Sequence, residues 1–262
     1  MEIVKTGDLV EIERIDLLGV PIDIIAEDRF EQFVHESLKN KEFGKNIVLL
    51  SVWDLLRARR PGDYRNMVTD AALVIPISKS LLGGARFLTG KTPVRYMPFD
   101  FVVSILSFLE ACEETVYLLG GKPPILRKTE KNIRETFPRL RIIGRCPGVF
   151  RKQSEETLIL SIRKSAPSLL LIGQGIRGRE RWLARNTASL PKGMRLWVSD
   201  MFEVFAEKRK RPSRFAFDHG LEWVGFCLKK PFFIFRVFPF IYYHFLLLVY
   251  RIKNRKQIAA KT

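Results

Sequence analysis

Short apolar runs that alternate with helix-like stretches are the feature that most limits how this chain can fold. The runs hold few polar residues, which is typical of strands buried on both faces of a sheet. They occupy residues 47–52, 71–75, 115–119, 140–143, 168–172 and 195–198. Helix-like stretches lie around them, at residues 28–38, 99–112, 124–137, 154–164 and 179–186. Because strands that alternate with helices form parallel sheets, we predict an α/β, Rossmann-like fold whose mostly parallel sheet is flanked by helices.

The 262 residues carry a formal net charge of +17, and this charge is unevenly distributed. Residues 2–42 hold more acids than bases, whereas Asp218 and Glu222 are the only acids beyond Glu207. The basic residues of this end flank a long apolar, aromatic run, which is typical of a lipid interface. We therefore expect two parts. One is an α/β domain over residues 1–205, with two βα halves that meet near residue 113, and the other is a helical, basic and aromatic appendage over residues 206–262.

A charge of this size attracts phosphates, whether of nucleic acid, anionic lipid or a phosphorylated substrate. The sequence has no RNP, helix-turn-helix or zinc-finger pattern, so we expect no nucleic-acid partner. Cys112, Cys146 and Cys227 are far apart and odd in number, which indicates free thiols in a reducing compartment and no metal site. Residues 1–8 lack an apolar signal segment, so a cytoplasmic location is the default expectation.

Two glycine-containing turns follow apolar runs, at the place where α/β folds bind their ligands. One turn is Gly120-Gly121-Lys122, and the other is Gly173-Gln174-Gly175 with Arg177, Arg179 and Glu180 behind it. Glycines let the backbone approach a ligand and turn N–H groups toward phosphate oxygens. The glycines can equally serve tight strand-to-helix turns, and the arginines can be solvated helix charges. Neither turn matches a P-loop or a dinucleotide-binding fingerprint.

Several short motifs, taken in order, resemble the WecG/TagA/CpsF family of bacterial glycosyltransferases over nearly the whole chain. The opening motif reads Leu-Gly-Val-Pro-Ile-Asp, and a later one reads Val-Tyr-Leu-Leu-Gly-Gly-Lys-Pro. The similar segments are residues 18–23, 116–123, 132–133, 137–140, 148–150, 211–212 and 221–223. Members of this family transfer a sugar, typically N-acetylmannosamine, from a UDP donor to a lipid-linked saccharide acceptor.

The resemblance implies a binding site for a UDP-sugar donor and no further cofactor. We expect backbone N–H groups of both glycine turns to hold the diphosphate, with arginine side chains nearby. The residues expected to bind the nucleotide sugar are Arg95, Gly120, Gly121, Lys122, Gly173, Gln174, Gly175, Arg177 and Glu180.

The general base is the point at which this sequence departs from the family. Relatives usually carry Pro-Asp-Gly after the third strand, and that Asp is their presumed base. Residues 76–78 here read Pro-Ile-Ser, so Ile77 replaces the acid. Asp100 matches another position at which the family has an acid, and it is our candidate catalytic residue for an inverting transfer. Asp100 can equally stabilise the start of the helix that we predict over residues 99–112.

Residues 231–250 form the aromatic run, which is long enough to span a bilayer as a helix. Arg236 and Pro239 within the run and cations at both of its ends favour a helix that lies on the membrane surface and breaks at Pro239. A last helix packed on the core and a spanning anchor are the alternatives. The residues expected to contact the membrane are Lys229, Lys230, Phe232, Phe233, Phe235, Arg236, Arg251, Lys253, Arg255 and Lys256.

Together these features predict a hexosyltransferase that moves a hexosamine of the N-acetylmannosamine type from a UDP-sugar to a polyprenyl-diphosphate-linked saccharide acceptor. It would serve cell-envelope or surface polysaccharide synthesis as a peripheral protein on the anionic inner face of the cell membrane, where it can also form homo-oligomers. The alternative is a catalytically inactive relative that binds sugar nucleotides or acts as a scaffold at the same membrane.

Overall fold

The central element of the computed structural model is a six-stranded parallel sheet. The structure describes residues 12–39, 44–178, 180–211, 213–220 and 237–259. The strands stand in the spatial order β4-β3-β8-β7-β5-β6. Their bounds are β3 Gly44–Leu50, β4 Leu73–Pro76, β5 Thr115–Leu119, β6 Arg141–Cys146, β7 Leu169–Gly173 and β8 Gly193–Ser199. Each coincides with one of the six predicted apolar runs, which confirms the expected sheet.

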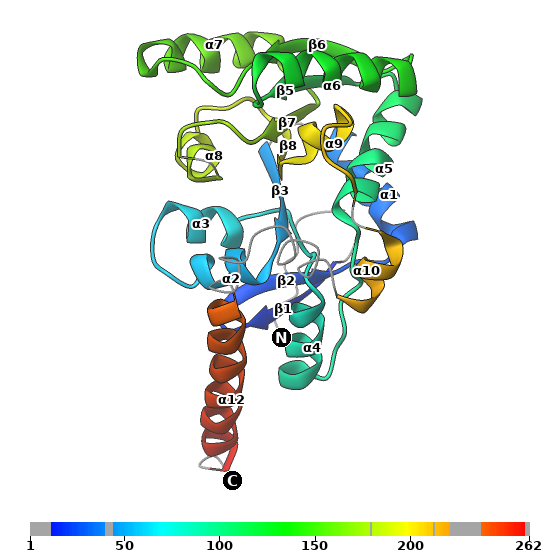
Figure 1. Cartoon of the computed structure of the whole chain (residues 1–262). Helices are drawn as coiled ribbons and strands as arrows, with labels where there is room; N and C mark the ends of the chain where they lie inside the picture. The colour runs from blue at the N-terminus through cyan, green and yellow to red at the C-terminus, as the bar shows by residue number, and fades with distance from the viewer. Residues whose placement is uncertain (1–11, 40–43, 179, 212, 221–236, 260–262) are drawn as a thin grey trace.

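Helices cover both faces of this sheet, as Figure 1 shows. Along β7, Leu169 and Leu171 belong to one apolar core, whereas Leu170 and Ile172 belong to the other, so the strand is buried on both sides. The first core is covered by α1 Glu27–Lys39, α5 Pro98–Ala111, α6 Pro123–Thr136 and α9 Met201–Phe205. The second is covered by α2 Val52–Ala58, α3 Asp63–Thr69, α4 Lys79–Thr89, α7 Glu155–Ser165 and α8 Glu180–Asn186, and η1 Lys152–Ser154 precedes α7. The α/β, Rossmann-like fold is therefore confirmed.

An antiparallel hairpin precedes the sheet and is absent from our prediction. Its strands are β1 Glu13–Leu17 and β2 Val20–Ile24, joined by Leu18 and Gly19. Both turn residues have positive φ, 59° and 82°, as a two-residue hairpin turn requires. Asp23 anchors the hairpin to the main sheet, because its buried carboxylate pairs with Arg14 at 2.7 Å and accepts from the Val74 backbone N–H at 2.7 Å.

Two described helices belong to the C-terminal part, α10 Arg214–His219 and α12 Val237–Ala259. α12 begins at Val237, two residues before Pro239, and is continuous through this residue; the part of the predicted helix before Val237 lies outside the described residues, so the break stays a prediction. Pro239 stands in the first turn of the helix, where a missing backbone N–H costs little. Figure 1 shows α12 extending away from the sheet, with the C-terminus at its far end.

One face of α12 is anchored on the α/β body. Tyr243 is fully buried and donates from its hydroxyl to the backbone oxygen of Ser80 at 3.1 Å, and Leu247 is buried beside it. The helix contacts α2 and α4. Among the described helices, none has both the length and the apolar character needed to cross a membrane. The division of the chain near residue 206 stays a prediction.

Candidate functional site

The carboxyl ends of β5 and β7 flank the point at which the sheet changes its winding direction. From β5 the chain proceeds to β6 on one side, whereas from β7 it proceeds to β8 on the other side. Ligands of open α/β sheets bind in the crevice that such a reversal creates. Both predicted glycine turns lie here, because one follows Leu119 at the end of β5 and the other includes Gly173 at the end of β7.

The two glycine turns touch each other through their backbones. The N–H of Gly121 donates to the oxygen of Gln174 at 2.5 Å. A Cβ on Gly120, whose φ is +127°, would come within 2.6 Å of the Gly173 oxygen. The N–H of Gly148, in the loop after β6, donates to the Gly121 oxygen at 2.9 Å. Only residues without a side chain allow this approach, so the turns form one continuous surface.

These contacts alter the expected role of the backbone N–H groups. The N–H of Gly120 donates to Cys146, that of Gly121 to Gln174, and that of Gln174 to Ser199. Groups engaged in this way hold the loops together and are not available to a diphosphate. These three N–H groups therefore fix how the turns meet, and the expectation that other backbone N–H groups of the two turns bind a diphosphate stays a prediction.

Two predicted cations stand at this edge of the sheet. Lys122 precedes α6 and is exposed, and Arg177 is exposed in the turn after β7. The side chain of Gln174 is held in place, because its amide nitrogen donates to the Glu203 carboxylate at 2.6 Å. Arg179, the third cation of the motif, lies outside the described residues. Both side chains are exposed to solvent, and their contact with a diphosphate stays a prediction.

Arg95 lies away from the glycine turns, beside the end of β4. Its Nε donates to the Ile77 oxygen at 2.9 Å, just beyond β4, and its guanidinium covers the Phe217 ring of α10 at 3.7 Å from the centroid. The guanidinium also donates to the Phe217 oxygen. Because β4 is the edge strand far from β5, Arg95 fastens α10 to the opposite half of the sheet edge.

Asp100 is exposed in the first turn of α5. Since α5 leads back to the amino end of β5, the helix begins at the carboxyl edge of the sheet, as a site residue should. Its neighbour Phe99 packs against Phe205 with ring centroids 4.8 Å apart and lies beneath Arg211. An acid in the first helical turn also stabilises the helix. Both interpretations of Asp100 fit this position.

A cluster of polar side chains after β3 was missed in the sequence. Ser51 and Asp54 form a capping box at the start of α2, in which the Ser51 hydroxyl donates to the Asp54 carboxylate at 2.5 Å and the Ser51 N–H at 3.1 Å. Arg57 pairs with Glu180 of α8 at 2.9 Å and lies over the Tyr64 ring. The Ser-x-x-Asp spacing predicts the start of a helix. No local sequence pattern predicts that Tyr64 and Glu180 lie beside it.

The electrostatics of this cluster, Ser51, Asp54, Arg57, Tyr64 and Glu180, are unusual for a surface loop. Burial raises the pKa of the Asp54 carboxyl above its ordinary value; the hydrogen bonds from Ser51 and the charge of Arg57 oppose this rise, and the charge of Glu180 adds to it. Burial also raises the pKa of the Tyr64 hydroxyl, with the charge of Asp54 acting in the same direction. Shifts of this kind gather at functional sites.

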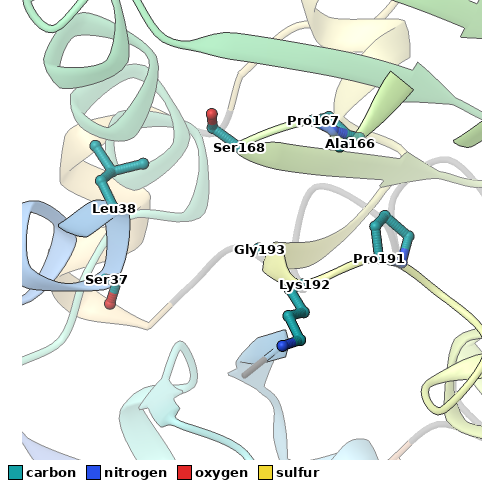
Figure 2. Close-up of a pocket in the computed structure, with 8 residues that line it drawn as sticks. All are labelled: Ser37, Leu38, Ala166, Pro167, Ser168, Pro191, Lys192 and Gly193. Carbon is teal, nitrogen blue, oxygen red and sulfur yellow. The ribbon is translucent and has the colours of Figure 1, made fainter. Parts of the chain in front are cut away.

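A cavity of about 290 Å³ lies at the other end of the sheet, where Figure 2 shows its lining at the starts of β7 and β8. Ser168, Lys192 and Gly193 are among the lining residues. Ligands of this fold class bind at the carboxyl ends of strands, so this cavity is not the candidate site. Within the described residues, no group of three or more His, Cys, Asp or Glu side chains can hold a metal ion.

The structure therefore places the two glycine turns together at the ends of β5 and β7 and a carboxylate cluster beyond β3, both on one edge of a parallel sheet. A comparison with known protein families identifies the family of this chain. Residues 15–259 match the glycosyl transferase WecG/TagA/CpsF family, a span that includes most of the hairpin, the whole sheet and all of α12. This chain belongs to the WecG/TagA/CpsF family of glycosyl transferases, which act in cell-envelope polysaccharide synthesis.

Proposed function

We propose that this protein transfers a hexosamine of the N-acetylmannosamine type from a UDP-sugar to a polyprenyl-diphosphate-linked saccharide, with inversion at the anomeric carbon. The observation that carries the proposal is the meeting of the two glycine turns at the switch point between β5 and β7. A diphosphate needs a backbone that it can approach closely and cations that neutralise its charge as it leaves. The turns offer the first at Gly175, where a Cβ would have no neighbour closer than 3.5 Å, and the second through Lys122 and Arg177.

The lipid-linked acceptor fits a second feature, the exposed face of α12. Its large apolar side chains recur every three or four residues and point away from the face that Tyr243 anchors. They are more than half exposed and comprise Phe238, Ile241, Tyr242, Phe245, Leu248 and Ile252. We call this set the α12 stripe. A contiguous apolar surface of this kind on a folded protein marks an interaction site.

Cations accompany the α12 stripe. Lys253 is exposed, and Arg251 covers the ring of Phe87, itself partly exposed on α4. Apolar side chains inserted at the headgroup boundary together with cations facing anionic lipid suit a peripheral protein on the inner face of the cell membrane. Of the other residues predicted to contact lipid, Lys229, Lys230, Phe232, Phe233, Phe235 and Arg236 lie outside the described residues, as do the side chains of Arg255 and Lys256.

A catalytically inactive relative is the second candidate function. The observation in its favour is Ile77, an apolar residue directly after β4 at the same edge of the sheet. Such a protein would bind the sugar nucleotide at the crevice without turning it over.

The proposal is tested by calorimetric titration of the full chain with UDP, UDP-N-acetylglucosamine and UDP-N-acetylmannosamine, followed by a transfer assay on a short-chain polyprenyl-diphosphate-N-acetylglucosamine. We expect UDP to bind, and the double change Lys122→Ala and Arg177→Ala to weaken binding about tenfold or more, because two charge-assisted contacts are lost. Lys131→Ala is the matched control, since Lys131 is an exposed lysine of α6 that pairs with Glu135.

Three outcomes are informative. Transfer of the sugar supports the enzyme. Binding without transfer, across these donors, favours the inactive relative. A chain that binds neither UDP nor either UDP-sugar contradicts both.

A further inference from the structure

We propose that Asp54 is the general base that takes the proton from the acceptor hydroxyl, an assignment that rests on the proposed sugar transfer. No sequence motif points to this residue. The inference comes from its position at the sheet edge and from the side chains packed around it.

Asp54 lies beyond the carboxyl end of β3, next to the strand that ends before Ile77. β3 and β4 run side by side, with Leu50 opposite Pro76 and the Ile77 N–H donating to the Leu50 oxygen at 2.9 Å. Beyond this pair, β4 continues into Ile77, whose side chain cannot accept a proton. β3 continues into Ser51 and the α2 turn that presents Asp54. A carboxylate therefore follows the neighbouring strand, which is closer to β7 in the sheet order.

Glu180 begins α8, directly behind the turn that carries Gly173 and Gly175. It pairs with Arg57, one helical turn after Asp54 in α2, at 2.9 Å. This contact holds the carboxylate of α2 and the glycine turn of β7 in a fixed relation. Both partners are partly shielded from solvent, which favours a defined geometry over a fluctuating surface pair.

Asp54 is only partly exposed, and burial among Tyr64, Arg57 and Glu180 raises its pKa above the ordinary value of 3.8. A carboxylate with a raised pKa is a stronger base. The ionised form, which accepts the proton, dominates only at pH values above that pKa. The Ser51 hydroxyl and N–H fix the orientation of its oxygens. Asp100, by comparison, is exposed in the first turn of α5.

Because the folded-state pKa of Asp54 is raised, its ionised form is less favourable in the folded chain than in the unfolded chain. The folded state therefore gains relative stability as the pH falls through this pKa and loses it as the pH rises. A carboxylate whose ionisation opposes folding is the pattern expected of a functional group.

The transfer step balances with Asp54 in this role. The acceptor hydroxyl oxygen forms a bond to the anomeric carbon of the donor while its proton moves to the Asp54 carboxylate. The bond from the anomeric carbon to the β-phosphate oxygen breaks, and UDP leaves with the electron pair. Asp54 ends as a carboxylic acid and returns its proton to water.

The test compares Asp54→Asn with the wild type in donor binding, turnover and thermal unfolding. We expect kcat to fall by about 100-fold or more, the usual effect of losing a general base, while the Kd for UDP stays within about twofold. The unfolding temperature at pH 7 stays the same or rises, because the amide still accepts from the Ser51 N–H and carries no charge. The acid limb of the wild-type pH profile of kcat should vanish in Asp54→Asn, and Asp54→Glu should recover part of the turnover.

The control is Asp63→Asn, which removes the same charge from the exposed first turn of α3 and should leave kcat unchanged. Turnover of Asp54→Asn equal to that of the wild type overturns the assignment. So does a turnover loss that merely follows a lower unfolding temperature, as a capping role alone would produce. Loss of turnover in Asp100→Asn with Asp54→Asn active would move the role to Asp100. A wild type that binds UDP and transfers nothing refutes the proposed function and this assignment together.

Discussion

Single glycines decide whether the donor crevice exists. Gly120 has a φ of +127° and faces the Gly173 oxygen, so Gly120→Ala meets both a strained backbone and a backbone contact at 2.6 Å that no side-chain rotation relieves. We expect the change to destabilise the fold by about 2–4 kcal/mol and to weaken UDP binding at least tenfold, because the β5 and β7 loops must separate. Denaturant unfolding and UDP titration measure the two effects.

Gly19→Ala is the control that introduces backbone strain without a steric contact like the one between Gly120 and Gly173. Gly19 also has a positive φ, 82°, but a Cβ there has nothing within 4 Å. This variant should lose about 1–2 kcal/mol and keep its UDP affinity. If Gly120→Ala binds UDP as tightly as Gly19→Ala does, the crevice between β5 and β7 is not the donor site.

At the level of elements, α12 depends on a small residue of α4. A Cβ on Gly84 would come within 1.9 Å of the Tyr243 hydroxyl and 3.2 Å of Leu247, the two side chains that anchor α12. Gly84→Ala should therefore displace α12 and lower the free energy of unfolding by about 1–3 kcal/mol. Hydrogen exchange of residues 237–259 should become faster, because the helix loses its buried face.

The neighbouring glycine provides the comparison. Gly83 is one residue away in α4, and a Cβ there has nothing within 4 Å. Gly83→Ala should stabilise the protein by about 0.5–1 kcal/mol through helix propensity alone. Equal stability and equal exchange in the two variants would mean that α12 is not anchored through Tyr243.

Elements differ in how far the sequence predicts them. Five of the six strands of the main sheet are predictable because each is a mainly buried apolar run, whereas the edge strand β6 has only partly buried and exposed residues. The helices α2, α3 and α4 are not among the predicted stretches, and length alone does not explain this, because α8 is as short as α2 and α3 and is predicted. The β1–β2 hairpin is missed because its stability depends on the distant contact between Asp23 and Val74.

The candidate site follows the same rule. The glycine turns are recognisable because local backbone geometry demands glycine at the ends of β5 and β7. The cluster around Asp54 is not, because Tyr64 and Glu180 reach it through tertiary packing of α3 and α8 onto α2. Proline predicts a break inside a helix but is tolerated in the first turn, which is where Pro239 stands in α12.

On the scale of the whole molecule, two forces should hold the protein at a membrane, and salt separates them. The net charge of +17 favours anionic lipid, and this attraction is screened as salt rises. The α12 stripe acts through burial of apolar area, which salt does not weaken. In vesicle flotation we expect strong binding to phosphatidylglycerol-containing vesicles at low salt, a partial loss at about 0.5 M salt, and weaker, salt-insensitive binding to phosphatidylcholine alone.

The binding that remains at high salt can be assigned to the α12 stripe by substitution. Phe245→Ser removes one large side chain of the α12 stripe, and burial of such a side chain contributes about 1.5–3 kcal/mol, so partition into either vesicle should fall about tenfold or more. Leu160→Ser is the control, because Leu160 is 48% exposed on α7, outside the stripe. Equal flotation of the two variants would exclude lipid as the partner of the stripe. If Phe245→Ser instead changes the sedimentation coefficient of the lipid-free protein, a second copy of the chain covers this surface, and the homo-oligomer becomes its occupant.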